Sequence, residues 1–320
     1  MKFFVVLVVL SSLLFSEMLE RTQVLMGTYV SITLPKEDAT ALQKSFEILH
    51  AVDGSLSSYN NKADIYRLNH NRTVQLTPYS YEALTLSKKY YQKSDGYFDI
   101  AIGSITKKLY RFGEEERLVS EDDLNKANTD IKGLHFNQKK AWLDEGTMID
   151  LGGMGKGFGV DKVAEYLHEQ NISQGIIALS GDIRCLDICT MAIQNPFGEG
   201  TVAEFVTKEP NTAISTSGNY RRYIKSTKHN HLIDPKKRAS QQVFASITLL
   251  SHNNNSDIDA YATAASVMQL KKARSFLDGL GVGYVLITNS GDQYVSDNLG
   301  AFVEQFHFTQ RVPFSCESEL

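Results

Sequence analysis

The sequence lacks several features that would assign a protein to a class at once. Its 320 residues include only three cysteines, six prolines and one tryptophan, and the formal net charge is −4. It contains no internal repeat, no low-complexity tract and no Pro/Ser-rich linker. Because the charges nearly balance, the composition argues against a general affinity for nucleic acid. An anionic ligand would have to be bound by a local cluster of basic groups or backbone amides. The composition, with 42% hydrophobic and 22% charged residues, is that of an ordinary globular protein.

The scarce cysteines carry no predicted chemistry. An odd number of cysteines cannot form a closed disulfide framework. Cys185 and Cys189 in "CLDIC" are separated by three residues and have no Cys or His partner nearby, so they make a poor zinc site. We expect alternate burial of this pair along a strand, with a disulfide between them as the alternative. No role is assigned to Cys316.

Long hydrophobic runs are also missing, apart from the first sixteen residues, "MKFFVVLVVLSSLLFS". This run is too short to span a bilayer comfortably and is typical of a signal peptide that ends near Ser16. We therefore predict an exported, periplasmic protein, with an uncleaved anchor in the inner membrane as the alternative. Since no cysteine lies near the cleavage site, a lipoprotein is disfavoured. Residues 1–16 are taken as the signal peptide and residues 17–320 as a single domain.

Helix-type and strand-type patterns alternate along the chain. Apolar residues at three-to-four spacing predict a first helix that Gly54 ends and a second helix over about 80–94. Later helices are predicted over 160–170 and 261–280, the last one preceded by a loop at 253–260. Strand character is found at 24–34, 175–184, 189–194, 202–206 and 281–291, and a last hairpin would pair 293–299 with 302–308. This mixture predicts an α+β fold with much antiparallel sheet.

Glycine is concentrated in one place, "DLGGMGKGFGVD" at 150–161, which has five glycines and Lys156. The stretch is not a P-loop, because Gly157 stands where Ser or Thr should follow the lysine, and it lacks the G-x-G-x-x-G spacing of dinucleotide-binding folds. One interpretation is tight packing at a turn. The other is an anion site, in which free amides and the positive end of a helix dipole act together with Lys156.

Two other stretches contain residues that could carry chemistry. Asp259 and Thr263 are four residues apart, which places a carboxylate and a hydroxyl on one face of a helix, and hard oxygen donors suit Mg²⁺. An N-cap role for Asp259 is the alternative. In "HNHLIDP", His231 is either a base near neutral pH or a surface histidine in a turn. Asp234 is interpreted as a capping residue.

Together and in order, eight motifs between residues 21 and 305 resemble the ApbE-type FAD:protein FMN transferases. They are "MGT" at 26–28, "SSYN" at 57–60, "GYFDIAIG" at 96–103, "DLGGMGKGFGVD", "SGDI" at 180–183, "STSGNYRRY" at 215–223, "HLIDP" at 231–235 and "DAYAT" at 259–263. The resemblance implies a two-lobed, T-fold-like α+β fold with antiparallel sheets and flanking helices. It also implies a FAD crevice between two intimate lobes.

The resemblance also implies the site residues. The positions that would contact FAD are Met26, Tyr59, Tyr97, Phe98, Asp99, Asp150, Lys156 and Leu232. Among them, Tyr59 would stack on the isoalloxazine. The carbonyl of Gly153 and the side chains of Asp259 and Thr263 would hold Mg²⁺, and His231 would be the general base. Two departures are Gly155, where many relatives have alanine, and the absence of a Thr-Gly turn after Pro235; neither removes a ligand.

The reaction implied is transfer of FMN from FAD to a Thr or Ser hydroxyl of a target protein, with release of AMP. The target would be a flavoprotein, such as a membrane-associated redox subunit, that carries the pattern Asp/Glu-x-x-Ser/Thr-Gly-Ala-Ser/Thr. This chain contains no such stretch, so self-modification is not expected. Two alternatives stay open: a Mg²⁺-dependent FAD pyrophosphatase that gives FMN and AMP, and a periplasmic flavin-binding protein without turnover.

Overall fold

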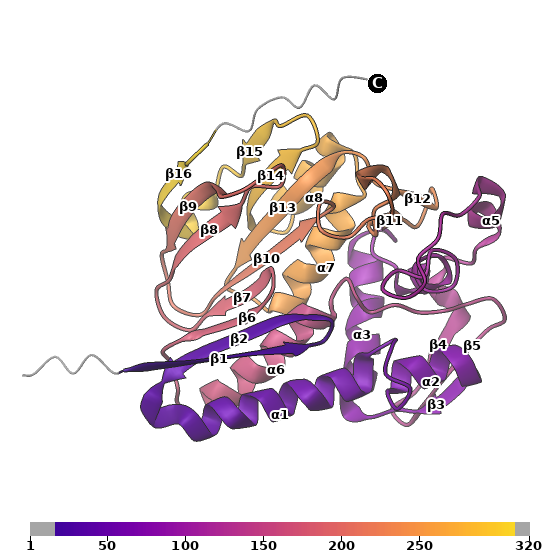
Figure 1. The fold of residues 1–320 in the computed structure, drawn as a ribbon, viewed down its shortest axis with the longest axis horizontal. Coiled ribbons are helices and arrows are strands. Elements are labelled where there is room, and N and C mark those ends of the chain that lie inside the picture. Colours follow the sequence, from indigo (N-terminus) through magenta and orange to yellow (C-terminus); the bar gives the residue numbers. More distant parts are fainter. Residues whose placement is uncertain (1–16, 311–320) are drawn as a thin grey trace, which may run out of the picture.

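An eight-stranded antiparallel sheet is the centre of the computed structural model, which describes residues 17–310. The predicted signal peptide at 1–16 and Cys316 lie outside the described residues. In spatial order the strands are β1 (Met18–Leu25), β2 (Thr28–Pro35), β6 (Ile176–Leu179), β7 (Asp182–Cys185), β10 (Thr212–Gly218), β13 (Phe244–Ser251), β14 (Gly283–Thr288) and β15 (Gln293–Val295). The sheet therefore joins the beginning and the end of the described chain (Figure 1).

Helices α1 (Ala39–Leu56), α6 (Gly155–Glu169) and α7 (Asn255–Ser266) cover one face of this sheet (Figure 1). The other helices are α2 (Asp64–Asn71), α3 (Pro78–Lys93), α4 (Gly103–Thr106), α5 (Glu121–Lys126) and α8 (Leu270–Asp278). Helices α1 and α6 pack on β2 and β6, and α7 packs on β10 and β13. Two apolar clusters fill the space between the helices and the sheet, and they include Phe46, Leu49 and Phe158, all fully buried.

Smaller sheets complete the fold. The sheet of β16 (Val303–Phe308), β9 (Thr201–Thr207) and β8 (Thr190–Gln194) packs on the other face of the main sheet, where Phe205 and Ile214 share an apolar cluster. The remaining strands are β3 (Thr73–Gln75), β5 (Lys140–Leu143) and β4 (Leu134–Phe136) in one sheet, and β11 (Ile233–Asp234) and β12 (Ala239–Ser240) in another. Short 3₁₀ helices are η1 (Lys36–Asp38), η2 (Ile100–Ile102), η3 (Ile131–Gly133), η4 (Thr227–His229) and η5 (Leu299–Ala301).

The predicted fold class is confirmed. All strand pairs within residues 17–310 are antiparallel, and the helix predicted over 80–94 is α3. The strand predicted over 24–34 is a hairpin, because Met26 and Gly27 turn the chain with φ of 53° and 71°. Positive φ at both central residues is typical of a two-residue turn between antiparallel strands.

Three helix boundaries were wrong. Helix α1 continues through Gly54 to Leu56, because buried residues on both sides of Gly54, such as Val52 and Leu56, hold this last turn against the core. Helix α6 begins at Gly155 rather than at 160, so half of the glycine stretch is helical. The helix predicted over 261–280 is two helices, α7 and α8, and α7 starts at Asn255 inside the expected loop. Tertiary packing outweighs local propensity in each case.

Two pairings were also wrong. Strands β15 and β16 do not form a hairpin: β15 pairs with β14 in the main sheet, and β16 pairs with β9 in the three-stranded sheet. Cys185 and Cys189 form a disulfide instead of lying along one strand. Strand β7 ends at Cys185, and the chain turns before β8, which brings the two Cα atoms to 6.0 Å.

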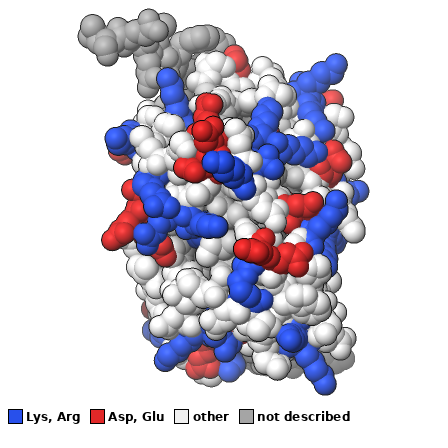
Figure 2. Space-filling view, turned by 90° about the vertical axis from the view of Figure 1, so that its right-hand side faces the viewer, with Lys and Arg blue, Asp and Glu red and all other residues white. Residues whose placement is uncertain are grey.

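Charged side chains of both signs are present on the surface shown in Figure 2. On the face shown in Figure 2, acidic and basic side chains are interspersed, which fits the small net charge. Among residues 17–310, no helix combines the length and apolarity needed to cross a membrane.

Candidate active site

A cavity of about 1350 Å³ collects segments from distant parts of the sequence. Pockets for small molecules typically measure roughly 300–1,000 Å³, so this cavity has room for a dinucleotide. It is lined by the β1–β2 turn, the chain after α1, residues 97–100, the glycine stretch, β10, the chain before and within β11, and α7. Every residue that the sequence predicts for the site lines this cavity.

The glycine stretch owes part of its composition to packing. A Cβ on Gly157 would lie 2.5 Å from the carbonyl oxygen of Asn255, and one on Gly153 would lie 2.9 Å from Cγ2 of Thr263. The first turn of α6 can therefore approach α7 only without side chains at these positions. By contrast, a Cβ on Gly155 would meet nothing within 4 Å. The packing interpretation is thus confirmed for Gly153 and Gly157, and the anion site stays a prediction for a segment that lines the cavity.

The three predicted metal ligands line the same cavity, and two of them are in contact. The Thr263 hydroxyl donates to the carbonyl oxygen of Gly153 at 3.2 Å, and the Asp259 carboxylate accepts from the amide of Gly157 at 3.1 Å. All donors are hard oxygens, which Mg²⁺ prefers. The residues present therefore fit a magnesium ion, although no group of three or more His, Cys, Asp or Glu side chains within residues 17–310 forms a metal cage.

The charges beside these donors leave a surplus of negative charge. Lys156 pairs with Asp182 at 2.6 Å and with Asp259 at 3.7 Å, so two buried carboxylates share one ammonium group. Burial and the neighbouring Asp182 raise the pKa of Asp259 above its usual range. The two carboxylates raise the pKa of Lys156 despite its burial, so this lysine stays charged. A cation at this place would offset the unmatched carboxylate.

His231 has the protonation state of a base. Its Nδ1 lies 3.1 Å from the backbone oxygen of Arg222. A carbonyl oxygen can only accept, so Nδ1 carries the proton and Nε2 keeps its lone pair. Burial and the nearby charge of Arg222 lower the pKa of His231 to about 4. The imidazole is therefore neutral near pH 7.

Asp150 is fixed by contacts that the sequence did not reveal. Its carboxylate accepts from the Thr106 hydroxyl at 2.7 Å and from the Gly152 amide at 2.9 Å, and Lys107 lies 3.6 Å away. These contacts, with Lys107 foremost, hold the pKa of Asp150 below its usual range in spite of burial. Asp150 therefore stays ionised inside the cavity.

Tyr59 is surrounded by cations. The Lys107 ammonium lies 3.9 Å from the centre of the Tyr59 ring and contacts the phenol oxygen. Arg222 donates to the same oxygen at 2.7 Å, and the phenol donates to the backbone oxygen of Phe112 at 2.7 Å. One face of the ring is thus occupied by Lys107, and a flavin would stack on the other face.

The segment 97–99 is partly structural. Phe98 is buried in an edge-to-face contact with Tyr90, and the ring of Tyr97 lies under the ammonium groups of Lys236 and Lys272. The Asp99 carboxylate accepts from the amides of Ala101 at 2.8 Å and Ile131 at 3.0 Å. Burial raises the pKa of Asp99 to about 7. Its carboxylate thus joins two loops.

The last two predicted contacts, Met26 and Leu232, also line the cavity. Met26 in the β1–β2 turn packs against both clusters under the helices, and its sulfur lies 3.1 Å from where a Cβ on Gly159 would be. Leu232 is 6% exposed, and its amide donates to the side chain of Asn230 at 3.0 Å. Asp234, interpreted as a capping residue, accepts from the amides of Lys236 and Lys237.

Sequence reasoning missed four polar residues of the site: Thr106, Lys107, Asp182 and Arg222. Asp182 and Arg222 belong to the motifs "SGDI" and "STSGNYRRY", which were recognised without assigning a role to either residue. Thr106 and Lys107 lie just after "GYFDIAIG" and carry no signal of their own.

Comparison with known proteins gives consistent matches. The model of the ApbE family matches residues 26–286. The FAD:protein FMN transferase of Escherichia coli (strain K12) is 26% identical over 295 residues, covering 84% of this chain and 84% of that protein. The Vibrio cholerae protein of the same name is 25% identical over 306 residues, covering 88% and 91%. The solved structure of the flavin transferase ApbE from Vibrio cholerae is similar with a TM-score of 0.78 at 23% identity, covering 90% of this chain and 99% of that one. At that identity the structural likeness shows the fold.

Proposed function

The chain belongs to the ApbE family, and on that premise we propose that it transfers FMN from FAD to a Ser or Thr hydroxyl of a target protein. The acceptor oxygen attacks the phosphorus next to the riboflavin. A phosphoester bond forms, the pyrophosphate P–O bond breaks, AMP leaves, and the hydroxyl proton passes to a base. The observation that carries the proposal is a neutral histidine in the same cavity as a lysine–carboxylate cluster and a set of oxygen donors.

His231 takes the proton. Its Nε2 carries the lone pair, because Nδ1 is committed to the backbone oxygen of Arg222. A base that is neutral at working pH accepts a proton from the attacking hydroxyl without first losing one of its own.

Gly153, Asp259 and Thr263 would hold Mg²⁺. The ion supplies compensation for the charge that develops on the phosphoryl oxygens. The chain's own groups keep the site ready: Lys156 neutralises part of the carboxylate charge, and the absence of side chains at Gly153 and Gly157 lets α6 and α7 approach.

The remaining residues bind the flavin nucleotide. Tyr59 offers one ring face to the isoalloxazine, with Met26 and Leu232 as apolar contacts in the wall. Asp150 and Lys156 contact the nucleotide from the glycine stretch, and Tyr97 and Phe98 contact its adenosine end. For Asp99 we propose contact through the backbone, because its carboxylate is engaged by two amides.

The acceptor and the compartment belong to the proposal as well. The acceptor is a flavoprotein with an exposed Asp/Glu-x-x-Ser/Thr-Gly-Ala-Ser/Thr segment, such as a membrane-associated redox subunit. We propose export to the periplasm, and the disulfide between Cys185 and Cys189 supports it, since disulfides persist in oxidising compartments.

The test is to incubate the protein with FAD, Mg²⁺ and a soluble acceptor domain that carries this segment. Transfer predicts an acceptor mass increased by one covalently bound FMN and an equal amount of AMP. Free FMN and AMP with an unmodified acceptor would favour the pyrophosphatase. Intact FAD would favour a flavin-binding protein without turnover.

A further inference from the structure

Strand β8 is a free edge of the three-stranded sheet, whose order is β16-β9-β8. The amide of Thr207 in β9 donates to the carbonyl of Cys189, just before β8. Hydrogen-bonded and non-bonded pairs alternate along antiparallel strands. Met191 and Ile193 therefore bond to β9, whereas the backbone groups of Thr190, Ala192 and Gln194 point away from it. These three residues, all exposed, are called the β8 edge below.

The β8 edge lacks the protection that other edges of these sheets have. Natural edge strands carry charges, bulges or prolines, or are short, which blocks pairing with another chain. Strand β16 carries Glu304 and has a register shift between Glu304 and His307. Strand β1 carries Glu20 and Arg21, and β15 has three residues. The sequence of β8, "TMAIQ", has neither charge nor proline, and its pairing with β9 shifts register only at its end, between Ile193 and Gln194.

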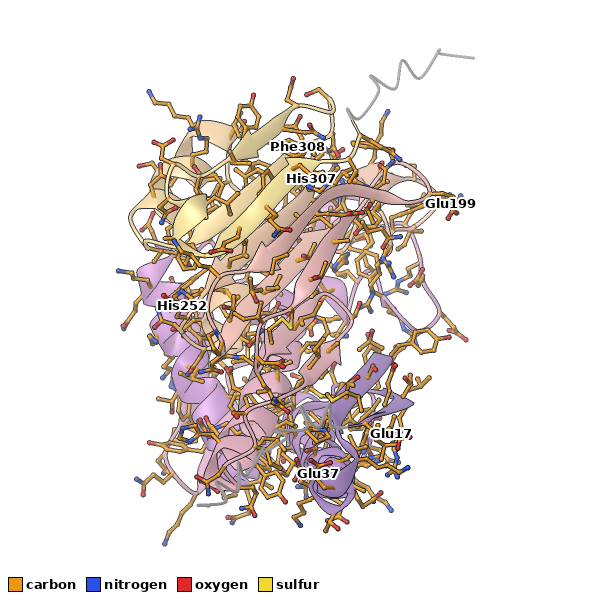
Figure 3. The ribbon with its side chains drawn as sticks, turned by 90° about the vertical axis from the view of Figure 1, so that its left-hand side faces the viewer. Glu17, Glu37, Glu199, His252, His307 and Phe308 are labelled. Atoms are coloured by element: carbon orange, nitrogen blue, oxygen red, sulfur yellow. A yellow bond between two sulfur atoms is a disulfide. The ribbon has the colours of Figure 1, made fainter. Side chains whose placement is uncertain are left out.

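Strand β8 borders the cavity that contains the proposed base, His231. Met191 and Gln194 lie in the wall of the cavity. The Gln194 side chain accepts a hydrogen bond from Arg221, and the next residue, Arg222, holds Nδ1 of His231 through its backbone oxygen. In Figure 3, Glu199, in the turn between β8 and β9, lies at the margin of the molecule. A chain paired with the β8 edge would thus run along the part of the cavity wall that residues 191–194 form, and His231 lines the same cavity.

The charge beside this path is positive. Residues 221–228, "RRYIKSTK", contain four basic residues and no acidic one, and Arg221, Lys225 and Lys228 are exposed. A segment that passes here gains from an acidic side chain, since complementary charge guides association.

We propose that the acceptor protein binds by adding an extended, hydroxyl-bearing segment to the β8 edge as a further strand, with an acidic side chain of the segment near Arg221. The proposal rests on the function proposed above and specifies its protein substrate. Main-chain hydrogen bonds supply the affinity in this mode of recognition, and they tolerate differences in sequence.

The first test replaces one backbone donor of the β8 edge. Ala192→Pro removes an amide that points away from β9, a position where an edge strand tolerates proline. We expect kcat/KM for the acceptor domain to fall roughly three- to tenfold, because one main-chain hydrogen bond is lost. Since Ala192 also lines the cavity, the dissociation constant for FAD is measured for this variant and its control, and only the loss of kcat/KM that exceeds the change in that constant is assigned to strand pairing. The matched control, Ala192→Thr, keeps the amide and should transfer as the wild type does.

The second test needs no variant. Hydrogen–deuterium exchange of the full protein with FAD is measured with and without an acceptor domain carrying an Asp-x-x-Thr-Gly-Ala-Thr segment. Added strand pairing predicts slower exchange at the amides of Thr190, Ala192 and Gln194 when the domain is present, and unchanged exchange in β16.

The outcomes separate this inference from the proposed function. Transfer with a protected β8 edge, impaired in Ala192→Pro alone, supports both. Wild-type transfer with an unprotected β8 edge, or with a fully active Ala192→Pro, overturns strand addition and leaves the transferase intact. Protection without transfer supports strand addition and contradicts the transferase. Neither protection nor transfer overturns both.

Discussion

The two ends of the cavity are built by different means. At the end where we propose that Mg²⁺ binds, called the metal end, Gly153 and Gly157 bring backbone against α7, and Asp259 is 2% exposed. At the end where we propose that the flavin stacks, called the flavin end, Tyr59 is 42% exposed and is held by the long side chains of Lys107 and Arg222. The first end is fixed by backbone packing, and the second by contacts that can readjust.

This difference follows from what each end must do. Charge developing in a transition state is stabilised best by groups that need no reorganisation when the reaction occurs. A flavin ring, in contrast, needs an aromatic face and some freedom to enter. Substitutions at the metal end should therefore affect turnover strongly, and those at the flavin end should affect affinity modestly.

The largest effect is expected for Asp259→Ala. Loss of the carboxylate removes the charged metal donor, so turnover of FAD should fall about a thousandfold or more, as expected when several kcal/mol of charge stabilisation are lost. FAD binding, measured by flavin fluorescence, should persist through the flavin end. The control is Asp257→Ala on the same helix, where the carboxylate pairs with Lys89 at 3.1 Å. Unchanged turnover in Asp259→Ala would refute the assignment of the metal donors.

His231→Gln should reduce transfer to the acceptor by about 10²- to 10⁴-fold, the usual range for a general base. Hydrolysis of FAD should fall less, because water in the cavity can lose its proton to solvent. The measurement is acceptor mass and free FMN in parallel, with His229→Gln as the control. Equal losses of both activities would point to a structural histidine.

The same residue sets a pH dependence. The pKa of His231 is lowered to about 4, so the neutral base predominates above that pH and is protonated below it. With Mg²⁺ at saturation, so that the raised pKa of Asp259 does not limit the rate, transfer should be level between about pH 6 and 8 and fall on acidification with a midpoint near 4, by titration of His231. A midpoint near the usual 6.5 in the rate profile would contradict a buried base.

Gly157 and Gly155 differ in how closely they are packed, so alanine substitutions at the two positions should differ in their effect on stability. Gly157→Ala places a Cβ 2.5 Å from a backbone oxygen and should destabilise the fold by about 1–3 kcal/mol, as overpacking does. Gly155→Ala meets nothing within 4 Å and should leave stability unchanged or raise it by up to about 1 kcal/mol. Thermal unfolding of both variants measures the difference. Equal melting temperatures would show that α6 and α7 do not depend on this close approach.

The smallest effect is expected at the flavin end. Lys107→Met removes the cation on the Tyr59 ring, worth about 0.5–1 kcal/mol, and also the ammonium group beside Asp150, so FAD affinity should fall at least roughly two- to fivefold. Maximal turnover should stay near that of the wild type. Lys108→Met, with an exposed side chain, is the control for the loss of charge. A large loss of maximal turnover in Lys107→Met would mean that the two ends are not separable.

The sequence predicted correctly those features that depend on residues close together in the chain. Asp259 and Thr263 are one helical turn apart, so their common face follows from spacing, and α3 follows from its apolar period. The signal was absent where contacts are distant. Gly157 is explained by Asn255, nearly a hundred residues away, and Tyr59 meets Lys107 and Arg222 through the folded chain. The start of α6 at Gly155 contradicts helix propensity, because contacts with α7 hold that turn.

The most direct test of the account is a crystal structure of the protein with FAD and Mn²⁺, recorded for anomalous scattering from manganese. The account predicts one strong peak bonded to the carbonyl of Gly153 and to the side chains of Asp259 and Thr263, with the isoalloxazine on the open face of Tyr59. A peak elsewhere, or none at saturating Mn²⁺, would contradict the division of the cavity into a metal end and a flavin end.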